Sequence, residues 1–233
     1  DLLEGSMVRC AGVTDITLIE DAPFHADVAA TRLHRWIRGD WQLLHFLAQG
    51  GWSSVNAINR WKMIDNLRRS LVAPMSCALL ILVLACGVVS PWAALALVAA
   101  AFSVGPLLGA LAGLAPSRDD IAIPYFYRQA LVDVVRAIFS GLWPLMQLLQ
   151  QALMSADAIG RTLYRMLISH RHLLAWTTAA ASQASTRSDL AATIHRHRAV
   201  TGTALVVGAL LVFMESAHPW LAMGLCLLWA ASP

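Results

Sequence analysis

The sequence predicts a mainly helical membrane protein whose N-terminal part is the tail of a water-facing α/β domain. Apolar residues make up 58% of the 233 residues, whereas a soluble domain averages about 45–50%. The 17 basic and 14 acidic residues are also unevenly distributed. Residues 70–117 carry no charged side chain, and residues 199–233 carry only Glu215. Residues 1–69 hold eight acidic and eight basic residues. These patterns exclude both a wholly soluble protein and one that lies entirely in lipid.

The N-terminal part reads as helix, strand and helix. Residues 1–13 fit a short helix because apolar residues recur after an acidic start at Asp1. Residues 13–20 alternate and are rich in β-branched side chains, which predicts a strand. Residues 27–47 have a helical pattern that we expect to be interrupted at Gly39 and Asp40.

The membrane region begins with an amphipathic segment. Residues 56–69 place apolar residues at helical spacing with arginines and a lysine between them, which predicts a helix in the membrane interface. Residues 70–90 and 92–115 each have roughly the 20 residues that a membrane span needs. A turn at Ser90 and Pro91 makes residues 70–115 a transmembrane hairpin.

The segment 116–198 is predicted to be amphipathic or cytoplasmic and helical. Residues 137–156 are uncharged, but they contain Pro144 and three glutamines, and arginines flank both ends. Positive residues on both sides disagree with a simple crossing, so an amphipathic or re-entrant helix is favoured over an extra span. Six arginines between residues 157 and 198 suit a cytoplasmic segment close to anionic lipid. Residues 199–233 form a second transmembrane hairpin, which turns at residues 215–218.

Charge and cysteine patterns argue against two other classes of site. The net charge of +3 is small and dispersed, so nucleic acid is not an expected partner. The four cysteines lack the spacing of a metal site or of a disulfide framework. Three of them lie in apolar runs and are expected to be buried thiols. The chain starts without an initiator methionine, and we expect it to be part of a longer protein.

The string R-L-H-R-W-I-R-G-D-W-Q over residues 32–42 carries the most chemical information. A tryptophan such as Trp36 offers an aromatic face on which a sugar ring can stack. An adjacent arginine such as Arg35 can neutralise a departing diphosphate. The alternative is an ordinary interfacial belt of tryptophan and arginine. Asp1, at a helix N-terminus, is either a general base or only an N-cap.

Three strings together point to a family. The pattern R-x-x-R-W-x-x-G-x-x-Q is typical of processive family-2 membrane glycosyltransferases. With D-L-L-E-G at residues 1–5 and R-W-K-M-I-D-N-L-R-R-S-L at residues 60–71, the chain resembles cyclic β-1,2-glucan synthases. It resembles the linear osmoregulated periplasmic glucan glucosyltransferases more distantly. Residues 157–163 and 169–176 are also similar to the segment between membrane spans of the cyclic enzymes.

The resemblance implies that residues 1–55 are the C-terminal part of a GT-A-like glycosyltransferase domain. Such an enzyme transfers glucose from UDP-glucose to a growing β-glucan with inversion. Asp1 would deprotonate the acceptor hydroxyl, Arg35 would bind the pyrophosphate, and Trp36 would stack on the acceptor glucose. The other substrate-binding residues that the resemblance implies are Glu4, Arg32, His34, Gly39, Asp40 and Gln42. Asp40 could instead be a solvated surface charge, and Glu4 could form only a local salt bridge.

The resemblance also implies parts that this chain lacks. The metal, Mg²⁺ or Mn²⁺, would be bound by an acidic motif in an upstream half of the domain, and a phosphorylase-like module would follow downstream. The expected partners are UDP-glucose, the glucan acceptor and the lipid bilayer. The expected location is a bacterial inner membrane, crossed several times, with the catalytic domain in the cytoplasm.

Two alternatives to a cyclic-glucan synthase remain at this point. One is a linear glucan synthase, which uses the same chemistry. The other is a transport or anchoring module without catalysis. A transporter usually carries ionisable groups inside its spans, and residues 70–115 have none, so the enzyme is favoured.

Overall fold

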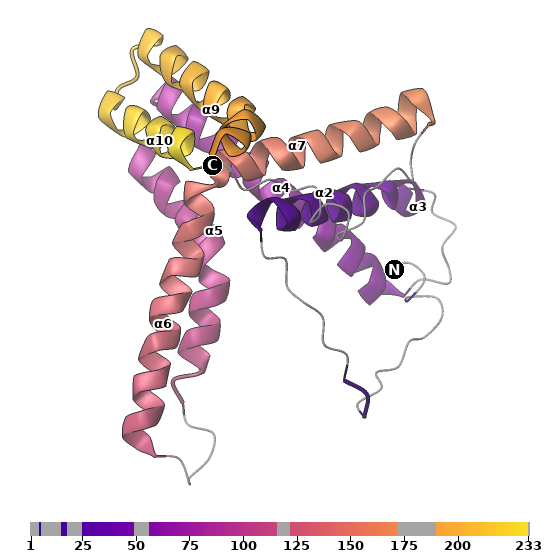
Figure 1. Ribbon diagram of the computed structural model, residues 1–233, viewed down its shortest axis with the longest axis vertical. Helices are drawn as coiled ribbons and strands as arrows, with labels where there is room; N and C mark the ends of the chain where they lie inside the picture. The colour runs from indigo at the N-terminus through magenta and orange to yellow at the C-terminus, as the bar shows by residue number, and fades with distance from the viewer. Residues whose placement is uncertain are drawn as a thin grey trace. The chain divides into compact units, whose positions relative to one another are not determined.

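The computed structural model describes residues 5, 15–17, 25–48, 56–115, 122–171 and 190–232. In these ranges the chain forms helices joined by turns, without a strand, which confirms the mainly helical class (Figure 1). The chain divides into two compact units. One comprises Asp1–Pro74 with Ala152–Ala192, and the other comprises Met75–Gln151 with Thr193–Pro233.

Most of the predicted N-terminal helix and strand lies outside the described residues. Gly5 is helical, in agreement with the helix expected over residues 1–13. Residues 15–17 form a bend and irregular backbone rather than part of the strand expected over residues 13–20.

Helix α2 spans Ala26–Gln42 and is followed by the short helix α3, Leu44–Ala48. The negative charge of Asp27 in the first turn stabilises α2, because it lies near the positive, N-terminal end of the helix dipole. The interruption expected at Gly39 and Asp40 is wrong, because the helix continues through both and breaks at Leu43. A glycine inside a helix costs only about 1 kcal/mol relative to alanine, which the packing of Val28 and Ile37 can offset.

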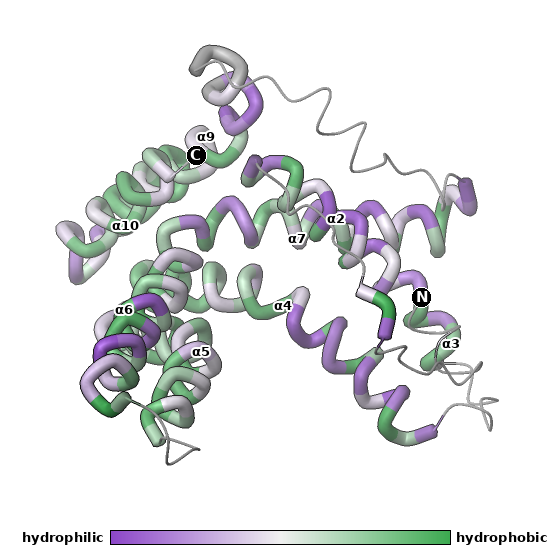
Figure 2. The backbone as a smooth tube through the Cα atoms, turned by 60° about the horizontal axis from the view of Figure 1, so that its bottom comes forward, coloured by the Kyte–Doolittle hydropathy of each residue, from purple (hydrophilic) through white to green (hydrophobic). Residues whose placement is uncertain are grey.

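The expected interfacial helix and the first expected span form one continuous helix, α4, over Ala57–Cys86. Its 30 residues extend about 45 Å at 1.5 Å per residue. Polar residues dominate its start and apolar residues its later part, as Figure 2 shows. Pro74 lies inside the helix and at the boundary between the two units.

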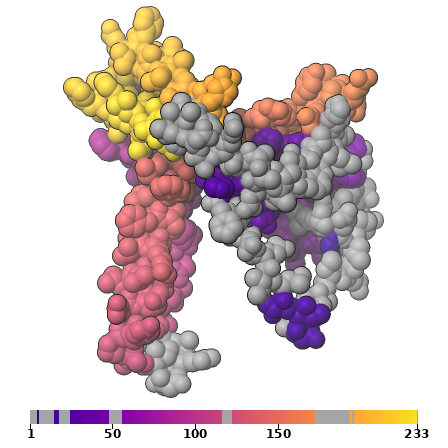
Figure 3. Space-filling view, viewed as in Figure 1, coloured from indigo at the N-terminus to yellow at the C-terminus, as the bar shows by residue number. Residues whose placement is uncertain are grey.

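In the second unit, α5 (Pro91–Ala112) packs lengthwise against α6 (Ile123–Met146), and the two form one column in Figure 3. Pro91 starts α5 at a position where its missing N–H is not needed, as expected for the turn at Ser90 and Pro91. The close approach requires Gly141, because a Cβ there would lie 2.8 Å from the Cα atom of Ser103.

The helix expected over residues 137–156 is divided into two. Helix α6 ends at Met146, and α7 runs over Leu148–Tyr164 before a π-helical turn, η1, over Arg165–Ser169. Helix α6 continues through Pro144, and the break lies at Gln147, whose N–H still donates to Trp143 O at 3.4 Å. The apolar helix in this region is therefore α6, displaced toward the N-terminus from the expected segment.

The expected C-terminal hairpin consists of α9 (Leu190–Phe213) and α10 (Pro219–Ala231). The expected turn is present, and Ser216 Oγ there donates to Leu84 O at 2.8 Å. The core around it contains Leu84, Leu211, Ala222 and Cys226. Trp229 is fully buried and donates through Nε1 to Leu145 O at 3.3 Å.

Among the described residues, four helices are long and apolar enough to cross a membrane: Ala57–Cys86, Pro91–Ala112, Ile123–Met146 and His195–Phe213. Helix α10, with 13 residues, would span about 20 Å, less than the roughly 30 Å hydrocarbon core. The buried thiols expected in the apolar runs are found at Cys77 and Cys226. Cys86 is exposed at the end of α4, contrary to that expectation, because the helix ends there.

Candidate functional site on helix α2

The sequence motif occupies one side of α2. Successive residues of an α-helix are rotated by about 100°, which places Arg32, Arg35, Trp36, Gly39 and Gln42 within a sector of about 120°. We call this sector the motif face. No side chain lies within 4 Å of the position that a Cβ atom of Gly39 would take, so the backbone of α2 is accessible there.

Arg32 and Trp36 form the defined contact of the motif face. The guanidinium carbon of Arg32 lies 4.6 Å from the centroid of the Trp36 ring, within the range of a cation–π interaction. The Trp36 side chain nevertheless remains 52% exposed. Arg32 therefore places its positive charge over one face of an aromatic ring that is still about half exposed.

The opposite side of α2 packs against other helices of the same unit. Ile37 is only 4% exposed. His34 Nε2 lies 3.0 Å from Asp157 Oδ2 on α7. Trp41 Nε1 donates to Ser70 Oγ on α4 at 2.9 Å. Together with Arg38, these residues fall within a sector of about 100°, which we call the packing face.

A further contact connects α2 to α4 at its C-terminal end. Asn66 Nδ2 donates to Asp40 Oδ1 at 3.0 Å, and Arg69 donates to the Asn66 Oδ1 atom. Asp40 is half-buried rather than a fully solvated charge. Burial raises the pKa of Asp40, while the hydrogen bond from Asn66 and the charge of Arg69 act in the opposite direction.

The contact with α7 is rich in positive charge. Burial lowers the pKa of the Arg38 guanidinium; the charges of Arg165 and Arg161 lower it further, and Asp157 acts against them. Burial alone would raise the pKa of Asp157, but hydrogen bonds and charge from Arg161 and His34 bring it below its ordinary value. Asp157 is therefore the counter-charge of this basic cluster.

The structure divides the predicted site residues into groups. Arg32, Arg35, Trp36, Gly39 and Gln42 share the motif face. His34 and Asp40 instead contact neighbouring helices. Asp1 and Glu4 lie outside the described residues. Within the described ranges, no group of three or more His, Cys, Asp or Glu residues could hold a metal ion.

Sequence reasoning missed the residues that hold α2. Asn66 and Ser70 lie in the string at residues 60–71, and Asp157 opens the string at residues 157–163. Both strings support the family resemblance. Neither string indicates which side chain of α2 its residues contact. His34 and Asp157 are 123 residues apart in the sequence, so no local pattern could have paired them.

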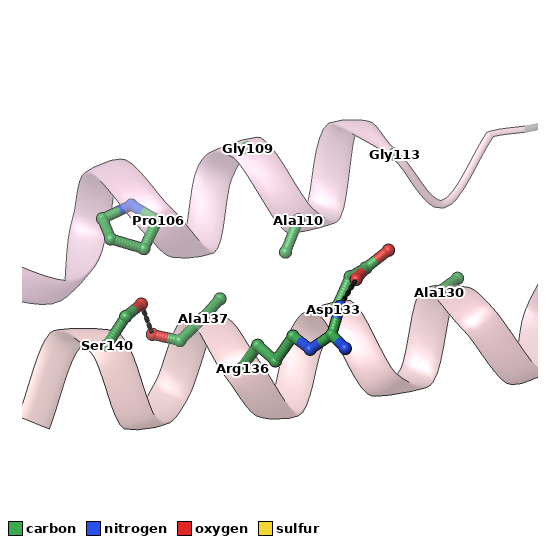
Figure 4. Close-up of a pocket in the computed structure, with 9 residues that line it drawn as sticks. All are labelled: Pro106, Gly109, Ala110, Gly113, Ala130, Asp133, Arg136, Ala137 and Ser140. Atoms are coloured by element: carbon green, nitrogen blue, oxygen red, sulfur yellow. Dashed lines mark hydrogen bonds and ion pairs between the residues drawn. The ribbon is translucent and has the colours of Figure 1, made fainter. Parts of the chain in front are cut away.

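A second polar feature lies between α5 and α6 in the other unit. A groove of about 440 Å³ is lined on α5 by Pro106 and small residues and on α6 by Asp133, Arg136 and Ser140. Figure 4 shows Asp133 and Arg136 in the space between the helices. Asp133 pairs with Arg136 at 3.4 Å and accepts from Gln129 at 3.2 Å. Charged residues are expensive inside a membrane, so this pair makes the groove a candidate site on α6.

A comparison with known proteins identifies a relative that matches the whole chain. The chain is 37% identical to the cyclic beta-(1,2)-glucan synthase NdvB of Rhizobium meliloti, and the match covers 100% of this chain. The resemblance to cyclic β-1,2-glucan synthases is confirmed. The chain spans 8% of the length of that glucan synthase. No protein-family model matches the chain.

Proposed function

We propose that this chain is the acceptor-side end of the transferase domain, with the adjoining membrane region, of a cyclic β-1,2-glucan synthase. The observation that carries the proposal is the identity of 37% to such a synthase along the entire chain. The exposed Trp36 beside Arg32 supports it, because glucan synthesis needs an aromatic platform and fixed positive charge.

The proposed reaction is an inverting transfer of glucose from UDP-glucose. A hydroxyl of the growing glucan attacks the anomeric carbon, and the bond from that carbon to the UDP oxygen breaks. Asp1 accepts the hydroxyl proton, and UDP leaves with the bonding electron pair. Trp36 stacks on the acceptor glucose, and Arg35 neutralises the pyrophosphate. Mg²⁺ or Mn²⁺ would be bound by residues of the parent protein outside this chain.

The same proposal places the parent protein in a bacterial inner membrane with its catalytic domain in the cytoplasm. The four candidate spans support a membrane location. The upstream transferase half and a downstream phosphorylase-like module would complete the enzyme. A linear glucan synthase would use the same residues, and analysis of the product for free ends distinguishes the two.

A second candidate function is the passage of a polar solute through the membrane. The groove beside Asp133 and Arg136 specifically favours it, because it lies on a candidate span. Asp133→Asn would then abolish solute uptake by vesicles, whereas the transferase proposal expects this variant to synthesise glucan at the wild-type rate.

The first experiment incubates membranes that contain the full parent protein with labelled UDP-glucose and a divalent metal. Asp1→Asn should abolish glucan synthesis at unchanged protein level, because it removes the base with little change in shape. Trp36→Ala should lower the rate by roughly tenfold or more, since it removes the aromatic face on which the C–H groups of the acceptor glucose would pack.

Trp61→Ala is the matched control, because Trp61 is also exposed but lies on α4, away from the motif face. Equal activity of Trp36→Ala and Trp61→Ala would reject the role of Trp36. Absence of glucose incorporation by the wild-type protein would reject the transferase proposal itself.

A further inference from the structure

Helix α7 contacts α2, the helix that carries the sequence motif, although the two helices are more than 100 residues apart in the sequence. Its Asp157 lies 3.0 Å from His34 Nε2 and accepts from Arg161 Nε at 2.7 Å. The Asp157 side chain is therefore fixed from both sides, by its own helix and by α2. We infer that Asp157 is a positioning residue of the transferase site, which acts through His34 to fix the rotation of α2.

The geometry of α2 explains how a contact on one side of the helix controls the position of side chains on its opposite side. His34 and Trp36 are two residues apart, so their side chains project about 160° apart around the helix axis. A side-chain tip lies roughly 6 Å from that axis, so a rotation of about 10° moves it by about 1 Å. Holding His34 in place therefore also determines where Arg35 and Trp36 point.

The charges at this contact favour a carboxylate at position 157. Arg38 of α2 interacts electrostatically with Arg161 and Arg165, and each of these pairs is repulsive. Asp157 offsets this repulsion through its interactions with Arg38, Arg161 and His34. Without the carboxylate, like charges on α2 and on the α7–η1 segment would favour separation or rotation of the two helices.

The packing of α7 is consistent with a fixed partner for α2. Ser155, Ala158 and Thr162 are at most 4% exposed, and they recur at intervals of three and four residues, so they share one side of the helix. Thr162 Oγ1 donates to Ala158 O at 2.8 Å, which leaves the buried hydroxyl satisfied. Asp157 thus projects from a rigid, well-packed element.

This inference rests on the proposed transferase function and makes a kinetic prediction. A shift of about 1 Å in catalytic groups can cost up to roughly a hundredfold in rate. We therefore expect Asp157→Ala and His34→Ala to lower kcat for glucan synthesis roughly ten- to hundredfold. The KM for UDP-glucose should change less than kcat, since Arg35 acts mainly on the charge that develops as UDP departs.

The experiment uses the full parent protein in membranes and measures kcat, KM and the thermal midpoint of each variant. The double variant His34→Ala with Asp157→Ala should be no slower than either single variant, because both changes break one contact. Asp157→Glu keeps the charge and both oxygens and should recover most of the rate. Asp65→Asn is the control, since Asp65 pairs only with Arg68 and Arg69 within α4 among its identified ion pairs.

The outcomes separate this inference from the proposed function. Active wild-type protein with unaffected pair variants would overturn the inference alone. Losses of rate that add up in the double variant would also overturn the inference. Losses that disappear when the rate is normalised to the amount of folded protein would overturn it as well. A wild-type protein without transferase activity would overturn the proposed function, and the positioning role would fall with it.

Discussion

At the scale of single residues, α2 combines an exposed chemical surface with polar anchors. Arg32 and Trp36 are stacked on the motif face, while His34, Asp40 and Trp41 are each bonded to a neighbouring helix. Polar anchors fix direction more strictly than apolar contacts, because hydrogen bonds weaken steeply as their angles change. The contacts on the other sides of α2 therefore determine the direction in which the side chains of the motif face point.

Asp40 gives a test of whether its charge or only its hydrogen bond matters. Because burial raises its pKa above the unfolded value of about 3.9, its favourable contribution is complete below that value. It is lost as the pH rises through the folded-state pKa. Asp40→Asn keeps an oxygen acceptor for Asn66, so at pH 7 it should leave the thermal midpoint unchanged or raise it by about 1–2 °C.

The measurement is thermal unfolding of the purified parent protein between pH 4 and pH 7. Any gain from Asp40→Asn should shrink toward pH 4, where Asp40 itself becomes protonated. Asp65→Asn serves for comparison and should show no such gain, since it removes the negative charge that pairs with two arginines. A marked fall in stability of Asp40→Asn at pH 7 would show that the ionised carboxylate is required.

At the scale of elements, the pair α5–α6 depends on one position without a side chain. A Cβ on Gly141 would contact both the backbone and the side chain of Ser103, so the two helices approach closely at this point. Small residues at helix interfaces permit such close packing in membranes. The groove with Asp133 and Arg136 begins next to this approach, at Pro106 and Ser140.

Gly141→Ala should therefore lower stability by about 1–3 kcal/mol, the usual cost of overpacking. Gly105→Ala is the matched control, because nothing lies within 4 Å of its Cβ position and alanine is the better helix former. Thermal unfolding of both variants in detergent is the measurement. Equal midpoints for the two variants would show that α5 and α6 do not pack in this way.

At the scale of the whole molecule, α4 joins the polar and the apolar parts of the chain. Its first half contacts α2 through Asn66 and Ser70, and its second half contributes Leu84 to the core of the other unit. One uninterrupted helix of this length can carry its first turns in the interface and still cross the bilayer. We then expect the end at Cys86 to lie across the membrane from the charged first turns of α4 itself.

Labelling of the exposed Cys86 tests that topology. A membrane-impermeant maleimide should modify Cys86 in spheroplasts, from the periplasmic side. Thr31→Cys, at an exposed position of α2, should react only in inside-out vesicles. Cys86→Ser identifies the signal from this residue. Labelling of both positions from the same side would contradict a single crossing by α4.

The sequence by itself determined the helical class, the apolar helices and the motif, because hydropathy and helical spacing are local properties. It also carried the family resemblance, which was confirmed over the whole chain. Tertiary structure alone decided that α2 continues through Gly39 and Asp40 and that the apolar helix at residues 123–146 ends before Gln147. It alone paired His34 with Asp157 and Asp40 with Asn66. The physical reason is that such contacts join residues far apart in the chain, and their free energy depends on packing that no local pattern encodes.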